Sequence, residues 1–237
     1  MKQIYYLNSS MLKEDESLLA YILQNSQNNY YWSDEFNDEF YIALAKAGFI
    51  STSHQEKDKL VLLPEIQHEY GVLDFKDVHI SKKVKKLLHN KSLNLKMNSY
   101  FYDVLDAISH QHKYNWITGR YRELLEEMFV KHYDNFRVVS FELCVGDELI
   151  SGEVGYVIGA TYTSLSGFSS REKVYNNFGT LQLVKLSHYL ESKGFKFWNF
   201  GHPHMEYKKR LGVKVYDRAD FLQMWGKATT LPMINLS

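Results

Sequence analysis

The sequence predicts an α/β (α+β) protein built around an antiparallel hairpin and a strand–helix–strand unit. Residues 136–159 alternate between apolar and polar side chains in two runs separated by Gly146-Asp147, a pattern typical of a hairpin. An amphipathic run at 176–194 then lies between predicted strands at 161–167 and 195–201. The chain has 237 residues, of which 45% are hydrophobic, so it can bury a real core as one large domain or two small ones.

The N-terminal part predicts one helix and two strands. The helix lies at 39–50, where Gly48 is placed to end it. The two strands lie within 59–75 and are punctuated by Pro64 and Gly71.

Three helices are predicted in the middle of the chain. The first is a basic helix with Ser81 as its N-cap, and a short strand follows it within residues 79–98. The others lie at 100–112 and 120–134. The helix at 100–112 has four apolar side chains on one face, namely Phe101, Val104, Leu105 and Ile108.

The C-terminal helix at 176–194 completes the strand–helix–strand unit. It has one apolar stripe, formed by Leu183, Leu186 and Leu190, and Gly194 closes it. A short helix is predicted at 217–225. A hairpin followed by strand–helix–strand is the core order of the acetyltransferase-like (GNAT-type) fold, which is the architecture that we expect.

Composition excludes several classes of protein. Lys+Arg and Asp+Glu are both 28, so no overall basicity indicates a nucleic-acid partner. A single cysteine, Cys144, rules out an internal disulfide. The N-terminus lacks the apolar run of a signal peptide, and no apolar stretch approaches the ~20 residues that span a bilayer. We therefore expect a soluble, cytoplasmic protein with no membrane partner.

Common catalytic motifs are absent. Cys144 lies in an alternating strand and is predicted to be structural. The segment GFSS is not a nucleophile elbow, and no glycine-rich phosphate loop occurs. His202, His204 and Glu206 alternate and could face one way, but Pro203 interrupts them and a fourth ligand is missing. We therefore predict no metal there, and His202 or His204 is better suited to binding or proton transfer.

A run of small polar residues stands at the junction between the third strand and the following helix. Residues 164–177 contain four serines and the pair Asn176-Asn177, with no histidine and no cysteine. Such residues favour turns and helix caps, which is the simplest explanation. Hydroxyl and amide donors at this place would also suit a site that stabilises an oxyanion.

Five segments, in order across the chain, resemble one family. They read FYIALAKAGFI, VHISKKVKK, NWITGRYREL, SFELCVGDELISGEVGYVIGATYTSLSGFS and RLGVKVYDRADFL. Together they resemble the leucyl/phenylalanyl-tRNA–protein transferases, as a divergent member.

The resemblance implies an architecture and an activity. The architecture is a small N-terminal domain, residues 1–80, and an acetyltransferase-like aminoacyl-transfer domain, residues 81–237. The activity is transfer of an aminoacyl group from tRNA to the N-terminus of an acceptor protein or peptide, usually a basic one, within the N-end rule of protein degradation. The resemblance implies no metal and no coenzyme A, and we expect a monomer.

The reaction is aminolysis of an ester, which needs two reactants held together, an ammonium deprotonated and an oxyanion stabilised. The polar junction would line the cleft where the ester lies. The substrate-binding candidates of that junction are Ser164, Phe168, Asn176 and Asn177. His204 and Glu206 are further candidates.

The sequence lacks two acidic residues that the family has at its catalytic site. The position of the family's catalytic-site glutamate falls on Ser166, and that of a later aspartate falls on Asn199. We retain Ser166, Asn199 and His202 as catalytic candidates.

An acid appears instead at Glu153, where the family has an apolar residue of the pocket for the transferred side chain. Glu153 shares a strand face with Ser151 and Gly155. It could accept a proton or hold a substrate ammonium, or it could face a basic side chain and so change the amino acid transferred. It could also be a paired, partly exposed strand residue.

Basic clusters indicate a nucleic-acid interface despite the neutral total. The tRNA-binding candidates are Lys82, Lys83, Lys85, Lys86, Arg120, Lys208 and Lys209. Solvated helix faces often have the same composition. Trp116 is placed by the resemblance to stack on a terminal adenine, although core packing would also explain it.

Three functions compete. The first is an aminoacyl-tRNA–protein transferase. The second is a coenzyme A-dependent acyltransferase, although the segment NNFGTL only faintly resembles the required loop. The third is a non-catalytic RNA- or peptide-binding relative, which the missing carboxylates would allow.

Overall fold

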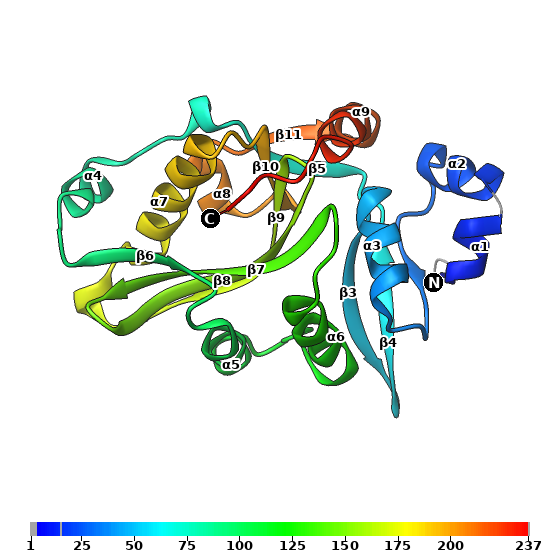
Figure 1. Cartoon of the computed structure of the whole chain (residues 1–237), viewed down its shortest axis with the longest axis horizontal. Helices are drawn as coiled ribbons and strands as arrows, with labels where there is room; N and C mark the ends of the chain where they lie inside the picture. Colours follow the sequence, from blue (N-terminus) through cyan, green and yellow to red (C-terminus); the bar gives the residue numbers. More distant parts are fainter. Residues whose placement is uncertain (1–3, 15, 237) are drawn as a thin grey trace.

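The computed structural model describes residues 4–14 and 16–236. Its core is a seven-stranded mixed sheet with the strand order β11-β5-β10-β9-β8-β7-β6 (Figure 1). All neighbouring strands in this sheet are antiparallel except β9 and β10, which are parallel. The predicted hairpin and strand–helix–strand order, and with them the α/β fold class, are therefore confirmed.

The strands are, in chain order, β1 (Tyr5–Tyr6), β2 (Tyr31–Trp32), β3 (Ile50–Glu56), β4 (Lys59–Glu65), β5 (Glu69–Leu73), β6 (Leu93–Met97), β7 (Phe136–Val145), β8 (Glu148–Ile158), β9 (Thr161–Ser169), β10 (Phe197–Gly201) and β11 (Lys214–Asp217). The helices are α1 (Ser9–Glu14), α2 (Glu16–Gln24), α3 (Asp38–Lys46), α4 (Lys82–Leu88), α5 (Phe101–Gln111), α6 (Gly119–Val130), α7 (Phe178–Ser192), α8 (Glu206–Leu211) and α9 (Arg218–Thr229). Among residues 4–14 and 16–236, no helix is long and apolar enough to cross a membrane.

Two glycines fix the meander of β7, β8 and β9. Gly146 turns β7 into β8 with φ 60°, and Gly159 turns β8 into β9 with φ 54°. At Gly159 a side chain would also collide, because a Cβ would lie 2.4 Å from the carbonyl oxygen of Ala228. These positive φ angles favour glycine and set the register of the hairpin.

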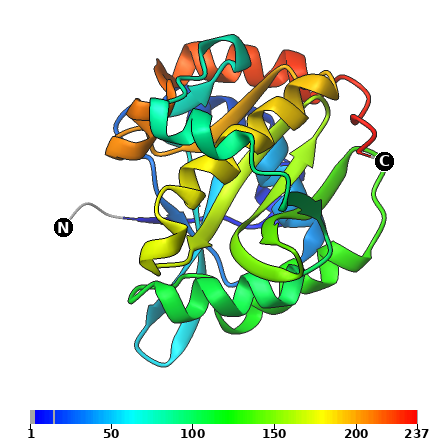
Figure 2. The same ribbon diagram turned by 90° about the vertical axis from the view of Figure 1, so that its left-hand side faces the viewer.

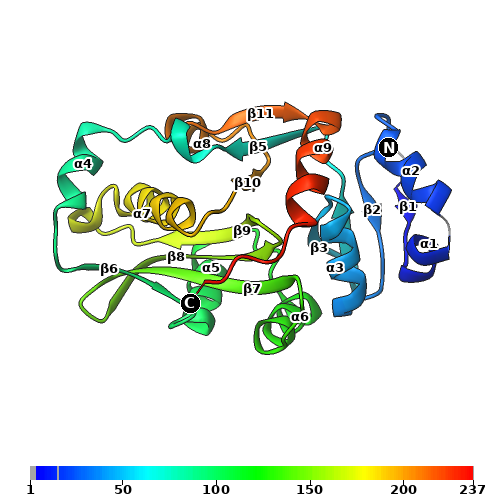
Figure 3. The ribbon, with the colours of Figure 1, turned by 45° about the horizontal axis from the view of Figure 1, so that its top comes forward.

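Helices cover both faces of the sheet. Figures 1 and 3 show α7 on one face and α5 with α6 on the other, and Figure 2 shows the same layers from the side. The four predicted core residues of α5 are all buried. On α7, Leu186 and Leu190 are buried as predicted, but Leu183 is only partly buried. Leu183 lines a cleft instead, because the neighbouring strands separate there.

The predicted helix boundaries agree with cap residues. Asn37 caps α3 by accepting a hydrogen bond from Phe40 N at 2.8 Å. Gly48, with φ 94°, follows the end of α3, so the helix stops before the predicted 39–50 range is complete. The Ser81 hydroxyl accepts from Val84 N at 3.3 Å, which confirms the predicted cap of α4.

Pro64 and Gly71 do not separate strands, contrary to the sequence prediction. Both lie inside strands, Pro64 in β4 and Gly71 in β5. Pro64 lies between Leu62 and Glu65, which form isolated bridges to residues on either side of β2. On the edge of β4 that faces β2, Pro64 therefore lies outside any continuous ladder of hydrogen bonds. Gly71 allows a close approach of chains, because a Cβ there would lie 3.1 Å from the carbonyl oxygen of Gly201.

The division of the chain at residue 80 stays a prediction. β5 precedes this position but lies between β10 and β11 in the large sheet. Any small N-terminal domain would therefore consist of the elements before β5, which form the sheet pieces β1-β2 and β3-β4 with α1 to α3.

Replacing Arg218 by methionine is expected to destabilise the fold by about 3–5 kcal/mol. The side chain is 7% exposed and donates to the carbonyl oxygens of Gln67 (2.9 Å), Asn25 (2.5 Å), Ile66 (2.8 Å) and Asn28 (3.3 Å). Methionine would leave these carbonyls without their donor. Urea unfolding followed by circular dichroism measures the change.

Lys227→Met is the matched control because Lys227 is exposed on the same helix, α9. Its free energy of unfolding should stay within about 0.5 kcal/mol of the wild type. A loss below about 1 kcal/mol for Arg218→Met would contradict the structural role of these bonds.

Candidate active site

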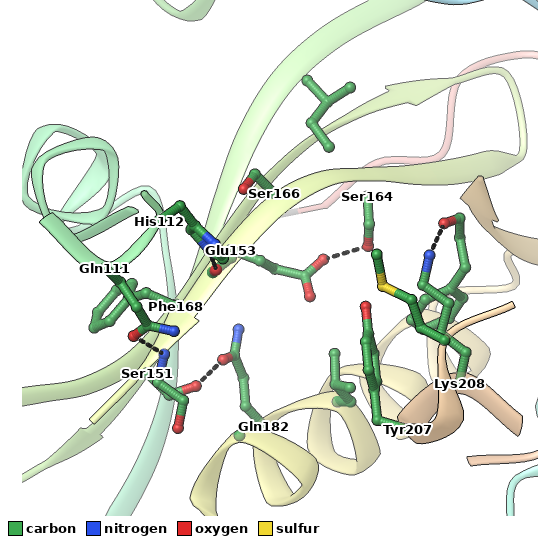
Figure 4. Close-up of a pocket in the computed structure, with 18 of the residues that line it drawn as sticks. Gln111, His112, Ser151, Glu153, Ser164, Ser166, Phe168, Gln182, Tyr207 and Lys208 are labelled. Atoms are coloured by element: carbon green, nitrogen blue, oxygen red, sulfur yellow. Dashed lines mark hydrogen bonds between the residues drawn. The ribbon is translucent and has the colours of Figure 1, made fainter. Parts of the chain in front are cut away.

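A cleft opens where the parallel strands β9 and β10 separate. The two strands pair only at three positions, Phe197 with Thr161, Trp198 with Tyr162 and Asn199 with Thr163. Beyond these pairs, residues 164–169 of β9 border a cavity of about 540 Å³ that α5, α7 and α8 complete (Figure 4). The polar junction noted in the sequence therefore forms one wall of a cleft.

Glu153 of β8 places a carboxylate in this cleft. Its side chain is 5% exposed, and Oε1 accepts hydrogen bonds from Tyr162 Oη at 2.7 Å and Ser164 Oγ at 2.8 Å. Burial raises the pKa of the Glu153 carboxyl to about 7, although both hydrogen bonds and the charge of Lys208 oppose the shift. Glu153 thus changes charge near neutral pH.

Ser164 is held in one orientation by its neighbours. Its Oγ accepts a hydrogen bond from the Trp198 indole at 2.8 Å and donates to Glu153 Oε1. Since an indole nitrogen can only donate, the hydroxyl proton must point at the carboxylate. Tyr162 and Ser164 therefore both donate to Oε1 of Glu153. Figure 4 shows the other carboxylate oxygen turned toward the cavity.

Lys208 lies across the cavity from Glu153. It was predicted to lie in an exposed tRNA-binding group, but it is only 5% exposed because α8 turns it inward. Its Nζ donates to the carbonyl oxygens of Phe200 (2.6 Å) and His202 (2.7 Å). Burial lowers the pKa of Lys208 to about 8, and the charge of Glu153 opposes the shift.

Polar side chains also surround the far end of the cleft. Ser151 of β8 donates to the Gln182 side chain of α7, which donates in turn to the carbonyl oxygen of Phe141 at 3.1 Å. The free edge of β9 is bound by the end of α5. His112 Nε2 donates to the carbonyl oxygen of Gly167 at 2.8 Å, and Gln111 accepts from Ser169 N at 3.1 Å.

Several predicted residues meet in this cleft. They are Trp116, Glu153, Ser164, Ser166, Phe168 and Lys208. Ser166 pairs with Val154, so it projects from the opposite strand face to Glu153, as Figure 4 also shows. Trp116 is half-buried against Tyr121, with ring centroids 5.2 Å apart.

Other predicted residues lie outside the cleft. Asn199 is buried, and its side chain contacts Thr163 and its own strand end rather than the cavity. His202 and His204 are exposed and contact two different carboxylates, Glu65 at 2.9 Å and Glu69 at 3.0 Å.

The remaining candidates of the polar junction and of α8 also lie away from the cavity lining. Asn176 ends a 3₁₀ turn, and Asn177, with φ 72°, precedes α7 without a side-chain cap bond. Glu206 begins α8 and pairs with Lys209 at 3.7 Å. Within residues 4–14 and 16–236, no group of three His, Cys, Asp or Glu side chains could hold a metal ion.

The basic residues of α4 are exposed as predicted. Lys82, Lys83, Lys85 and Lys86 surround the single buried residue Val84. Arg120 is exposed over the ring of Phe36 at 5.2 Å, and Lys209 is exposed on α8. By contrast, Cys144 is buried, and burial raises the pKa of its thiol, as expected of a structural cysteine.

Sequence reasoning missed Gln182, His112, Gln111 and Tyr207 as cleft residues. Gln182 could have been found, because it interrupts the buried face of α7 with an amide group. Tyr207 stands beside Lys208, and burial followed by the charge of Glu153 raises its pKa to about 12. No sequence pattern marks Tyr207, since its place depends on the short helix α8.

The β7–β8 hairpin followed by the β9–α7–β10 unit has the element order of the acetyltransferase-like α/β fold, and its two parallel strands divide around a cleft that holds a carboxylate. The sequence model of the leucyl/phenylalanyl-tRNA protein transferases matches residues 72–226. The chain therefore belongs to the leucyl/phenylalanyl-tRNA protein transferase family, whose members are enzymes that transfer an amino acid from tRNA to the N-terminus of a protein.

Individual relatives are distant. The chain is 24% identical over 164 residues to the leucyl/phenylalanyl-tRNA–protein transferase of Paracoccus denitrificans, covering 64% of this chain and 73% of that protein. It is 28% identical over 159 residues to that of Tolumonas auensis, covering 65% of this chain and 63% of that protein. The crystal structure of FemX is similar with a TM-score of 0.45 and 10% identity, covering 84% of this chain and 74% of that one.

Proposed function

We propose that this chain transfers an amino acid from aminoacyl-tRNA to the N-terminal amine of an acceptor protein, and that the reaction takes place in the cleft between β9 and β10. The observation that carries this proposal is the buried carboxylate of Glu153, which has one oxygen turned into the cavity and a pKa near neutrality. The carboxylates of the family motif are absent from this sequence, so Glu153 is proposed in their place.

Glu153 is suited to act as the general base. An N-terminal amine has an ordinary pKa of about 7.7–8, so part of it is uncharged near neutrality. As its nitrogen attacks the ester carbon, a proton must leave it, and a carboxylate with a pKa of about 7 is well matched to accept this proton. The bonds from Tyr162 and Ser164 would hold the carboxylate in place.

The first turn of α7 is suited to the developing oxyanion. Gly179 and Thr180 line the cleft, and the side chain of the N-cap residue Asn177 forms no cap hydrogen bond. Backbone N–H groups at a helix N-terminus carry partial positive charge, which favours a negative oxygen nearby. Phe168 and Leu183 supply apolar wall beside these groups.

The donor tRNA is proposed to bind along α4 and to place its terminal adenosine at Trp116. α4 packs against α7, the helix that borders the cleft. Its exposed lysines would contact phosphates, and Arg120 and Lys209 would extend this contact. Trp116 lines the cleft and offers an aromatic face for an unpaired base.

The acceptor peptide is proposed to enter past α8. Met205 lines the cleft, and the exposed side chains of His204 and Glu206 stand on either side of it in the chain. Glu206 would favour acceptors with basic residues near the N-terminus. We also propose a cytoplasmic monomer, which light scattering on the purified chain would test for its oligomeric state.

The test is transfer of radiolabelled amino acids from a total charged tRNA pool to peptides with different N-termini. Acetyl-coenzyme A with the same peptides is the comparison donor. Labelled peptide from the tRNA pool supports the proposal and names the amino acid. Transfer from acetyl-coenzyme A alone, or no transfer by the folded protein, refutes it.

A further inference from the structure

The cleft holds a second buried charge, which the family resemblance does not assign to the reaction. Lys208 lies on α8 and lines the same cavity as Glu153, yet no direct ion pair joins the two in the described part of the chain. Each nevertheless feels the charge of the other. Both groups line one cavity together with Tyr207, so a substrate in that cavity would lie near the amine and the carboxylate.

The hydrogen bonds of Lys208 leave one donor unused. A protonated lysine has three N–H donors, and two of them are directed at the carbonyl oxygens of Phe200 and His202. These two bonds fix the position of Nζ, because they are short and both carbonyls belong to the chain segment that leaves β10. The third N–H has no hydrogen-bond acceptor within residues 4–14 and 16–236, where Nζ also lies 6.0 Å from the ring centroid of Phe200 and 5.9 Å from that of Tyr207. This N–H is the one that a substrate atom in the cavity would use.

We propose that Lys208 is a catalytic residue that protonates the leaving ribose oxygen during transfer. This inference rests on the proposed function. The leaving oxygen of the tRNA ester is an alkoxide, a strong base that departs poorly unless it receives a proton as its bond breaks. Lys208 is a buried amine that lines the same cavity as Glu153, where the ester would lie.

The protons and bonds balance. The uncharged amine of the acceptor forms an N–C bond to the ester carbon, the carbonyl pair moves to oxygen, and Glu153 takes one proton from the nitrogen. The carbonyl then re-forms, the C–O bond to the ribose breaks, and the ribose oxygen takes a proton from Lys208. The products are an amide and a free hydroxyl, with Glu153 protonated and Lys208 uncharged.

One proton passing from Glu153 to Lys208 restores the starting state. The two groups have pKa values of about 7 and about 8, so this transfer is slightly downhill and requires no proton from outside. A lysine with an ordinary pKa of about 10.4 would be a weaker acid and would release its proton less readily.

The experiment compares two donors of the same amino acid, leucine or phenylalanine. One is the aminoacyl ester of tRNA, and the other is the p-nitrophenyl ester, whose leaving group departs without a proton near neutral pH. Lys208→Met should lower kcat about 10²–10³-fold with the tRNA ester. It should change kcat less than about fivefold with the p-nitrophenyl ester, since no leaving group there needs an acid.

Lys208→Arg separates charge from acid function. The guanidinium keeps the positive charge but does not give up a proton in proteins. We expect it to remain slow with the tRNA ester and to lack the decrease in rate above about pH 8 that loss of the Lys208 proton is expected to cause in the wild type. Circular dichroism confirms folding of both variants, and Lys227→Met, exposed on α9, is the control that should keep wild-type rates.

The outcomes separate the proposed role of Lys208 from the proposed transferase function. Equal losses with both donors, or full activity of Lys208→Arg with the tRNA ester, would overturn the role of Lys208 and leave the transferase function intact. A wild type that uses neither donor would overturn the proposed function as well. A loss confined to the tRNA ester supports Lys208 as the leaving-group acid.

Discussion

Replacing Glu153 by glutamine is expected to lower kcat for aminoacyl transfer by about 10²–10⁴-fold. Glutamine has nearly the same shape, and its oxygen can still accept the hydrogen bonds from Tyr162 and Ser164. It cannot take a proton from the attacking nitrogen. The KM for tRNA should change little, because Glu153 lies in the cleft and the proposed tRNA contacts lie mainly on exposed surfaces.

The same carboxylate predicts the acidic side of the pH profile. Because the ionised form of Glu153 is the base, the wild-type rate should rise as pH increases through about 7 and should be low where the carboxyl is protonated. The titratable groups that surround it are Tyr162, Tyr207, His112 and Lys208. Both tyrosines have pKa values raised well above this range, mainly by burial. Glu153→Gln should show no such rise.

Single-turnover transfer rates at several pH values measure both the lower rate of Glu153→Gln and its missing rise near pH 7. Thermal unfolding is the companion measurement, and the glutamine variant should be at least as stable as the wild type, since it no longer buries an ionisable carboxyl. A variant that transfers at the wild-type rate would reduce Glu153 to a structural residue. The base would then have to be sought elsewhere in the cleft.

Replacing the four α4 lysines by alanine is expected to raise the KM for aminoacyl-tRNA about 10–10²-fold at low salt. The salt dependence of tRNA binding should also become less steep, by about one unit for each lysine that contacts a phosphate. The substituted residues are Lys82, Lys83, Lys85 and Lys86. The p-nitrophenyl ester, which has no phosphates, should react as before.

A matched variant removes the same charge from other surfaces. It replaces four exposed lysines away from α4 and the cleft, namely Lys46, Lys57, Lys196 and Lys227. Its KM and salt dependence should stay near the wild-type values. If both quadruple variants lost tRNA affinity equally, net charge rather than the α4 surface would explain binding.

Much of the fold could be predicted because its local signals agree. Glycine turns, helix caps and alternating strands point to the same elements around the β7–β8 hairpin, and the structure has them there. The helices α1, α2 and α8 and the strands β1, β2, β3 and β11 were not predicted. All of them except α2 have two to seven residues, which is too short for a periodic pattern to stand out.

The site could be predicted only in part. Glu153 stood out because it is an acid among glycines and apolar residues of a buried strand. Lys208 did not, because it is one of three consecutive basic residues and only the packing of α8 separates it from its exposed neighbour Lys209. The separation of β9 from β10 leaves no sequence signal, since it depends on where pairing between two distant segments stops.

That separation of two parallel strands also suggests how this family could diversify. The cavity opens where pairing between β9 and β10 stops, so its existence does not depend on which side chain supplies the reactive acid. Ser166, where the family resemblance places a glutamate, pairs with Val154, the residue next to Glu153. An acid at position 166 would line the same cleft from the opposite strand face, so moving it between these strands would keep the scaffold but would require the reacting groups to shift with it.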